Sequence, residues 1–112
     1  MALELLDEYC RSLGSCLLED AKGRGFLIYI VRPPHVRFKE IYVRPEYRKQ
    51  GVGEAMCQLA AQIGKEQGCT HGIGSISLSN DGAMETLRFH LATGGTVTQA
   101  SDNVLTTEWL IP

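Results

Sequence analysis

No apolar run in this sequence is long enough to cross a lipid bilayer. Its first residues, 1–8, carry acidic side chains where a signal peptide carries basic ones. We therefore expect a cytoplasmic protein that does not enter a membrane. The sequence also lacks an excess of positive charge, because its formal net charge is -2. It has no general electrostatic reason to bind nucleic acid, and any basic character must be local.

The cysteine patterns of metal and redox sites are missing as well. No C-x-x-C pair occurs, and no histidine lies at metal-ligand spacing from any of the four cysteines, Cys10, Cys16, Cys57 and Cys69. We interpret these residues as reduced thiols, mostly half-buried, and we expect no metal site. His35 and His71 lie in expected loops and indicate nothing specific.

Two common phosphate-binding motifs are absent. A nucleotide P-loop needs Gly-Lys followed by Ser or Thr, and this tripeptide occurs nowhere in the chain. The dinucleotide fingerprint needs a third glycine three residues after Gly53, where the chain has Met56. Both motifs are excluded.

The residues that are present fit one domain, 1–112, with a single core. The chain is 44% hydrophobic and 21% charged, which is ordinary for a globular protein. Apolar periodicity and turn residues predict helices at about 3–13, 51–67 and 83–91. They predict strands at about 16–18, 26–31, 36–43, 73–78, 96–99 and 104–111. Alternation along the third strand predicts that Val36, Phe38, Glu40 and Tyr42 share one face, and Arg37, Lys39, Ile41 and Val43 the other.

The most informative stretch is the turn between the third strand and the second helix. Pro45 closes the strand, because it has no N–H to give to a ladder. Gly51 and Gly53 have no side chain, so a ligand can approach the backbone N–H groups that a helix start leaves unpaired. The helix dipole favours an anion there, and Arg48 and Lys49 add positive charge. The turn is therefore predicted to bind a phosphate group.

This stretch resembles the acetyl-coenzyme A binding motif of the GNAT superfamily of N-acetyltransferases, Arg/Gln-x-x-Gly-x-Gly/Ala. The motif residues here are Arg48, Gly51 and Gly53. Many members carry Val-x-Pro-Glu-Tyr-Arg just upstream, which residues 43–48 reproduce. The alternative is a glycine-bearing strand-to-helix turn of another α/β domain, and the flanking residues favour the family motif over it. The order of elements is also similar to the GNAT fold from its second helix onward.

The resemblance implies an α/β (α+β) fold with a mixed, mostly antiparallel, twisted sheet. Its central parallel pair of strands splays apart, and about three helices flank the sheet. Members usually begin with a further strand and helix that help to wall the acceptor site. This sequence does not show them, so we expect a more open acceptor groove, or one that a second subunit completes in a homodimer.

The resemblance further implies that acetyl-coenzyme A is the co-substrate. The residues expected to bind it are Ile41, Tyr42, Val43, Arg48, Lys49, Gln50, Gly51, Val52, Gly53, Glu54 and Asn80. Amides in 48–53 would bind the pyrophosphate, and backbone groups of Ile41 and Val43 would pair with the pantetheine arm. An amide near Val43 would polarise the thioester carbonyl. Ile41 and Val43 also suit plain sheet core, and Tyr42 and Trp109 suit packing.

Glu40 is the candidate general base, because it lies just before the segment that is expected to splay. An ammonium group with a pKa of about 10 must lose a proton before it attacks the thioester. In several members of the family an acid near this position contacts the amine. The alternative is a solvated strand carboxylate paired with Lys39 or Arg37.

His90 is the candidate general acid, on weaker grounds. The family often places a tyrosine after an Asn-x-x-Ala pattern, which Asn80 and Ala83 match, but the following helix contains no tyrosine. Counting back from Gly94 puts His90 at that position, whereas counting forward from Asn80 puts Leu87 there. A histidine can give a proton near neutral pH. The alternative, which the sequence favours, is an ordinary surface histidine.

Two functions follow from these expectations. The first is an acetyl-coenzyme A dependent N-acetyltransferase that acts on a primary amine, either a small molecule or a protein lysine or N-terminus. The alternative is a non-catalytic module that binds acyl-coenzyme A as a sensor or interaction domain, given the missing tyrosine.

Overall fold

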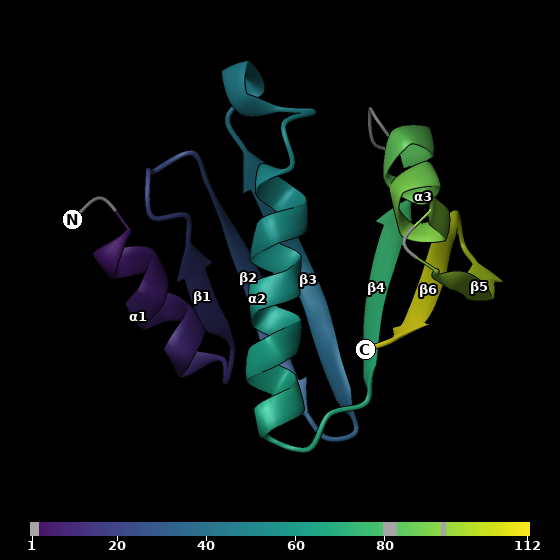
Figure 1. Cartoon of the computed structure of the whole chain (residues 1–112), viewed down its shortest axis with the longest axis horizontal. Helices are drawn as coiled ribbons and strands as arrows, with labels where there is room; N and C mark the ends of the chain where they lie inside the picture. Colours follow the sequence, from purple (N-terminus) through teal and green to yellow (C-terminus); the bar gives the residue numbers. More distant parts are fainter. Residues whose placement is uncertain (1–2, 80–82, 93) are drawn as a thin grey trace.

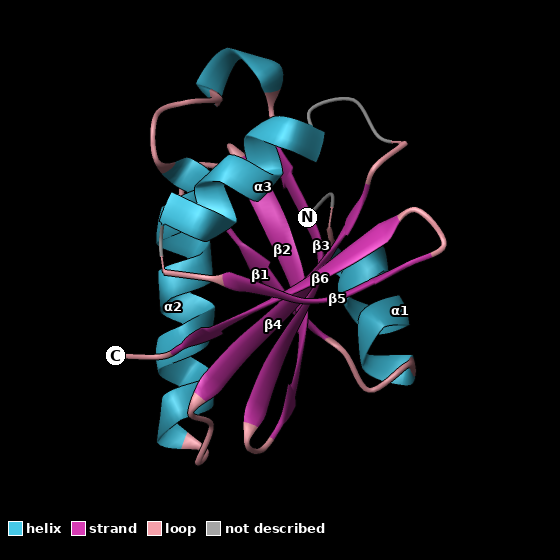
Figure 2. Cartoon of the chain, turned by 90° about the vertical axis from the view of Figure 1, so that its right-hand side faces the viewer, coloured by secondary structure: helices cyan, strands magenta, loops and turns pink. Residues whose placement is uncertain are grey.

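The chain folds around one six-stranded sheet with the strand order β1-β2-β3-β4-β6-β5. The computed structural model describes residues 3–79, 83–92 and 94–112. Helices α2 and α3 cover one face of the sheet and α1 lies on the other (Figure 2). The elements are α1 (Glu4–Ser12), β1 (Cys16–Glu19), β2 (Gly25–Arg32), β3 (His35–Val43), the 3-10 helix η1 (Pro45–Tyr47), α2 (Val52–Glu66), β4 (His71–Ser77), α3 (Ala83–Ala92), β5 (Thr96–Ser101) and β6 (Val104–Leu110). The predicted succession of helices and strands and the predicted fold class are confirmed.

The core lies between α2 and strands β2 and β3. Leu27 and Val36 are fully buried there, and Val52, Met56 and Ala60 meet them from the helix at four-residue spacing. This stripe is narrower than the predicted one, since Leu59, expected to be apolar and inward, is 53% exposed. Burial of the stripe holds the start of α2 against the end of β3, which positions the turn between them.

Gly64 allows α2 to approach the sheet closely. A Cβ atom added to Gly64 would overlap with Cγ2 of Val36. We expect Gly64→Ala to lower the free energy of unfolding by about 1–3 kcal/mol, because overpacking outweighs the gain in helix propensity. In a Val36→Ala background the overlap disappears, so the same substitution should be neutral or stabilising by up to about 1 kcal/mol. Urea denaturation of the four proteins measures this coupling, and a stabilised Gly64→Ala single variant would contradict it.

The parallel pair β3 and β4 is hydrogen-bonded along only part of its length. The paired residues run from His35 opposite His71 to Phe38 opposite Gly74. Beyond them the two strands diverge toward the end where α2 begins (Figure 1). The predicted splay of the central pair is therefore confirmed.

A β-bulge at Lys39 marks the point of divergence. On β2 the neighbours Ile28 and Tyr29 pair with Glu40 and Phe38, so Lys39 is an extra residue in β3. The bulge reverses the alternation of side chains. The predicted faces of β3 are therefore wrong after Phe38. An added Cβ on Gly53 of α2 would lie 3.2 Å from Ile41 Cδ1, so the Ile41 side chain points toward α2. Ile41 thus shares a face with Val36, opposite to the prediction.

Two further expectations from the sequence can be compared with the structure. His35 and His71 do not lie in loops, because they are the first residues of β3 and β4. Among the described residues, no helix combines the length and the apolar character needed to cross a membrane.

Candidate active site

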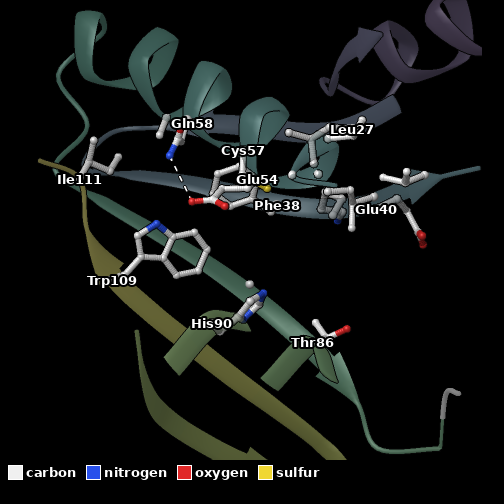
Figure 3. Close-up of a pocket in the computed structure, with 18 of the residues that line it drawn as sticks. Leu27, Phe38, Glu40, Glu54, Cys57, Gln58, Thr86, His90, Trp109 and Ile111 are labelled. Atoms are coloured by element: carbon white, nitrogen blue, oxygen red, sulfur yellow. Dashed lines mark hydrogen bonds between the residues drawn. The ribbon is translucent and has the colours of Figure 1, made fainter. Parts of the chain in front are cut away.

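A groove of about 740 Å³ opens where β3 and β4 separate (Figure 3). Its walls come from the end of β3, the following turn, α2, β4, α3 and β6. The residues predicted to bind the co-substrate that line it are Ile41, Val43, Arg48, Lys49, Gly51, Val52, Gly53 and Glu54. Glu40 and His90 also line it. One groove thus collects most of the predicted site from segments far apart in the sequence.

The turn before α2 has the geometry expected of an anion site. Gly51 has a φ of 81°, in the left-handed region, and an added Cβ there would meet no atom within 4 Å. The first bond of the helical ladder runs from the Ala55 amide to the Gly51 carbonyl, at 3.0 Å. The amides of Val52, Gly53 and Glu54 therefore precede the ladder, at the positive end of the helix dipole. Open space beside these amides fits a diphosphate.

Arg48 stabilises this turn as well as lining the groove. Its Nε donates a hydrogen bond of 2.9 Å to the carbonyl of Val43, and its guanidinium lies 5.7 Å from the centre of the Tyr42 ring. Tyr42 also packs on Phe26, with ring centres 5.9 Å apart. Because Tyr42 follows Ile41, it points to the sheet face opposite α2, so the packing interpretation accounts for its side chain.

Two other predicted residues contribute differently. The side-chain amide of Gln50 donates a hydrogen bond of 3.1 Å to the Glu46 carbonyl, which holds the turn together. Asn80, predicted from the Asn-x-x-Ala pattern, lies outside the described residues.

Glu40 lies at the rim of the groove. It is exposed and follows the bulge, and Figure 3 shows its carboxylate pointing away from His90 and Trp109. Among the described residues, neither Lys39 nor Arg37 forms an ion pair with it. The predicted alternative, a carboxylate paired with Lys39 or Arg37, therefore finds no such partner among the described residues.

His90 is not an ordinary surface residue, contrary to the interpretation that the sequence favoured. Its half-buried ring lies inside the groove (Figure 3), with Nδ1 2.6 Å from the hydroxyl of the fully buried Thr107. The ring centre is 5.5 Å from that of Trp109. Burial lowers the pKa of His90 below its usual value, because the charged imidazolium is poorly solvated there. Burial therefore favours the neutral form of the imidazole.

The floor of the groove contains an aromatic pair, of which the sequence analysis considered only Trp109, as a packing residue. Trp109 stacks on Phe38, with ring centres 5.3 Å apart and planes 20° from parallel. An added Cβ on Gly72 would lie 2.5 Å from the indole, so this glycine makes room for the ring. The available signal was Gly72 and Gly74 within one strand, since glycine inside a strand often faces a large neighbour.

The groove also contains a cysteine that is not a nucleophile at neutral pH. Burial, with a smaller effect from the charge of Glu54, raises the pKa of Cys57 to about 11. A thiol reacts as its thiolate, and this one stays protonated. The arrangement therefore suits direct transfer of an acyl group rather than transfer through an acyl-cysteine.

Comparison with known proteins agrees with this geometry. The model of the acetyltransferase (GNAT) family matches residues 3–91. The chain belongs to the GNAT family. The predicted family is therefore confirmed.

One curated relative is the thialysine N-ε-acetyltransferase of Sus scrofa. It is 29% identical to this GNAT chain over 73 residues, which are 62% of the chain and 41% of the relative. The chain thus spans less than half the length of that relative.

Solved structures show the same fold at low sequence identity. The chain is similar to the PaiA N-acetyltransferase from Thermoplasma acidophilum in complex with coenzyme A, with a TM-score of 0.78 and 20% identity, over 96% of this chain and 69% of that one. It is also similar to Ard1 from Thermoplasma volcanium, with a TM-score of 0.70 and 21% identity, over 99% of this chain and 79% of that one. These likenesses support the fold of the GNAT chain.

Proposed function

We propose that this GNAT protein is an acetyl-coenzyme A dependent N-acetyltransferase that transfers the acetyl group directly to a primary amine. One observation carries the proposal. The amides that precede the α2 ladder and the divergent ends of β3 and β4 border the same groove. An anion site and an extended, unpaired strand edge are the two features that a diphosphate with a peptide-like arm requires.

The residues of the turn hold the diphosphate in this proposal. The amides of Val52, Gly53 and Glu54 donate to its oxygens, and Lys49 supplies positive charge at the groove wall. Backbone groups of Ile41 and Val43 that face away from β2 pair with the pantetheine amides. When bound, acetyl-coenzyme A supplies a thioester, and an amide near Val43 stabilises the oxyanion that forms on its carbonyl oxygen.

Proton transfer is assigned to His90, in a role that differs from the one predicted by sequence. The reaction forms a bond between nitrogen and the acetyl carbon and breaks the carbon–sulfur bond. The acceptor ammonium first releases one proton to solvent at the mouth of the groove and becomes a neutral amine. As this amine attacks, its nitrogen loses a second proton to the neutral imidazole of His90, which as the imidazolium gives that proton to the departing thiolate. Thr107 orients the ring through Nδ1, as a positioning residue. Glu40 contacts the incoming ammonium at the mouth of the groove.

The acceptor is proposed as a primary amine of the kind carried by a lysine-like side chain. The relative from Sus scrofa is named for an N-ε-acetyl transfer to thialysine, which supports this class. The exposed carboxylates of Glu40 and Glu54 at the groove lining suit a cation. A protein lysine or N-terminus offers the same primary amine. The homodimer and the cytoplasmic location expected from the sequence remain predictions.

The test is release of free thiol from acetyl-coenzyme A in the presence of a panel of amines. The panel contains thialysine, a polyamine, a lysine peptide and a peptide with a free N-terminus. We expect at least one acceptor to raise thiol release at least about tenfold above hydrolysis, with the acetylated amine detected by mass spectrometry. Tight binding of acetyl-coenzyme A without acceptor-dependent release would instead identify the non-catalytic acyl-coenzyme A module.

A further inference from the structure

Three potential metal ligands meet at the closed end of the β3–β4 pair. The ligand atoms of His35, His71 and Glu108 all lie within 4.8 Å of one another. His35 Nε2 is 3.3 Å from Glu108 Oε1, and the two imidazole rings are 5.8 Å apart, centre to centre. The register of the strands brings the three side chains together. His35 pairs with His71 across β3 and β4, and β6, which carries Glu108, is the other neighbour of β4.

The cluster lies on the sheet face opposite the groove. Val36 packs against α2, and Gly72 and Trp109 face each other beside the groove. Each of these three residues is the sequence neighbour of one cluster residue. Because successive side chains of a strand point to opposite faces, the cluster residues lie on the other face of the sheet. The cluster therefore belongs to a site separate from the one proposed for acyl transfer.

The chemistry of the cluster matches a borderline divalent metal ion. Two imidazoles and one carboxylate form a ligand set that Zn²⁺ uses with a water in the fourth position. Tetrahedral ligands about 2.0–2.1 Å from the ion lie roughly 3.3–3.4 Å apart, which the distance from His35 to Glu108 already meets. The side chains of His35 and Glu108 are 39% and 28% exposed, so they can turn to close the remaining gap.

Thr70 provides a fixed partner for one of these rings. Its Oγ1 lies 2.7 Å from Nδ1 of His71. In histidines that bind metals, the ring nitrogen that does not contact the metal commonly forms a hydrogen bond to a nearby group, which sets the orientation of the ring.

We propose that His35, His71 and Glu108 form a binding site for a divalent transition-metal ion, with Zn²⁺ as the preferred ion. The ion ties β3, β4 and β6 together at the end where the parallel pair is closed. The proposed role of the ion is structural. It would fix the position of β6, which also carries Thr107 and Trp109 on the face that borders the groove. The proposal is independent of the acetyltransferase activity.

The test uses an untagged protein of residues 1–112 and Co²⁺ as a spectroscopic probe. We expect one Co²⁺ per chain, with visible absorption bands typical of tetrahedral nitrogen and oxygen ligands. One equivalent of Zn²⁺ should remove these bands. Zinc at about 100 times its Kd should raise Tm by roughly 10 °C, since a ligand that binds only the folded state stabilises it.

Variants assign the ligands. His35→Asn, His71→Asn and Glu108→Gln should each weaken Co²⁺ binding at least about tenfold. The matched controls are His90→Asn and Glu19→Gln, which remove the remaining histidine and an exposed strand carboxylate and should leave binding unchanged. Circular dichroism shows whether each variant is folded. No Co²⁺ binding by the parent protein, or equal loss in the controls, would overturn the site and leave an ordinary hydrogen bond between His35 and Glu108.

Discussion

Replacing Gly51 with glutamate should raise the Kd for acetyl-coenzyme A at least about 100-fold, equivalent to roughly 2.7 kcal/mol. The substituted carboxylate would stand in the open space beside the amides of Val52 and Gly53, where the proposed diphosphate binds. Two like charges about 4 Å apart near a protein surface repel by roughly 4 kcal/mol. The measurement is isothermal titration calorimetry with coenzyme A and acetyl-coenzyme A.

Gly51→Ala is the matched control for this experiment. Gly51 has a φ of 81°, so any side chain there costs about 1–2 kcal/mol of stability, and glutamate and alanine share that cost. Alanine adds no charge and meets no atom within 4 Å, so its Kd should stay within about threefold of the parent. An equal loss of affinity in both variants would attribute the effect to backbone strain. Unchanged affinity in Gly51→Glu would remove the diphosphate from this turn.

The open turn that forms this candidate anion site was predictable because its determinants are local. Pro45, Arg48, Gly51 and Gly53 lie within a few residues of one another, and each acts through its own backbone or a near neighbour. The strand before the turn and the helix after it also have clear apolar periodicity. The family motif summarises the same local physics.

The rest of the site depends on register between distant strands, which a single sequence does not specify. The extra residue at Lys39 reverses the faces of β3, and alternation alone could not reveal it. His90 enters the groove because α3 packs on β4 near Thr107 of β6. The histidine and glutamate cluster arises in the same way, from residues that are far apart in the sequence. Counting from a motif cannot find such neighbours.

His90→Gln should lower kcat for acetyl transfer by roughly 10²–10⁴-fold, the usual contribution of general acid–base catalysis. Glutamine keeps a polar group beside Thr107 but cannot take up a proton. The affinity for acetyl-coenzyme A should change little, because His90 lies on α3, away from the turn that precedes α2.

The pH profile distinguishes proton transfer from a merely structural role. Burial lowers the pKa of His90, so its neutral, proton-accepting form is lost only as the pH falls below that reduced pKa. The parent rate should therefore fall on the acid side of neutrality along a limb set by His90, and this limb should vanish in His90→Gln. The matched variant Glu40→Gln should retain the limb, because its carboxylate points away from the ring. A His90→Gln enzyme that keeps both the acid limb and at least about a third of the parent kcat would contradict the assignment of His90. Loss of the acid limb in Glu40→Gln would instead identify the Glu40 carboxylate as the base.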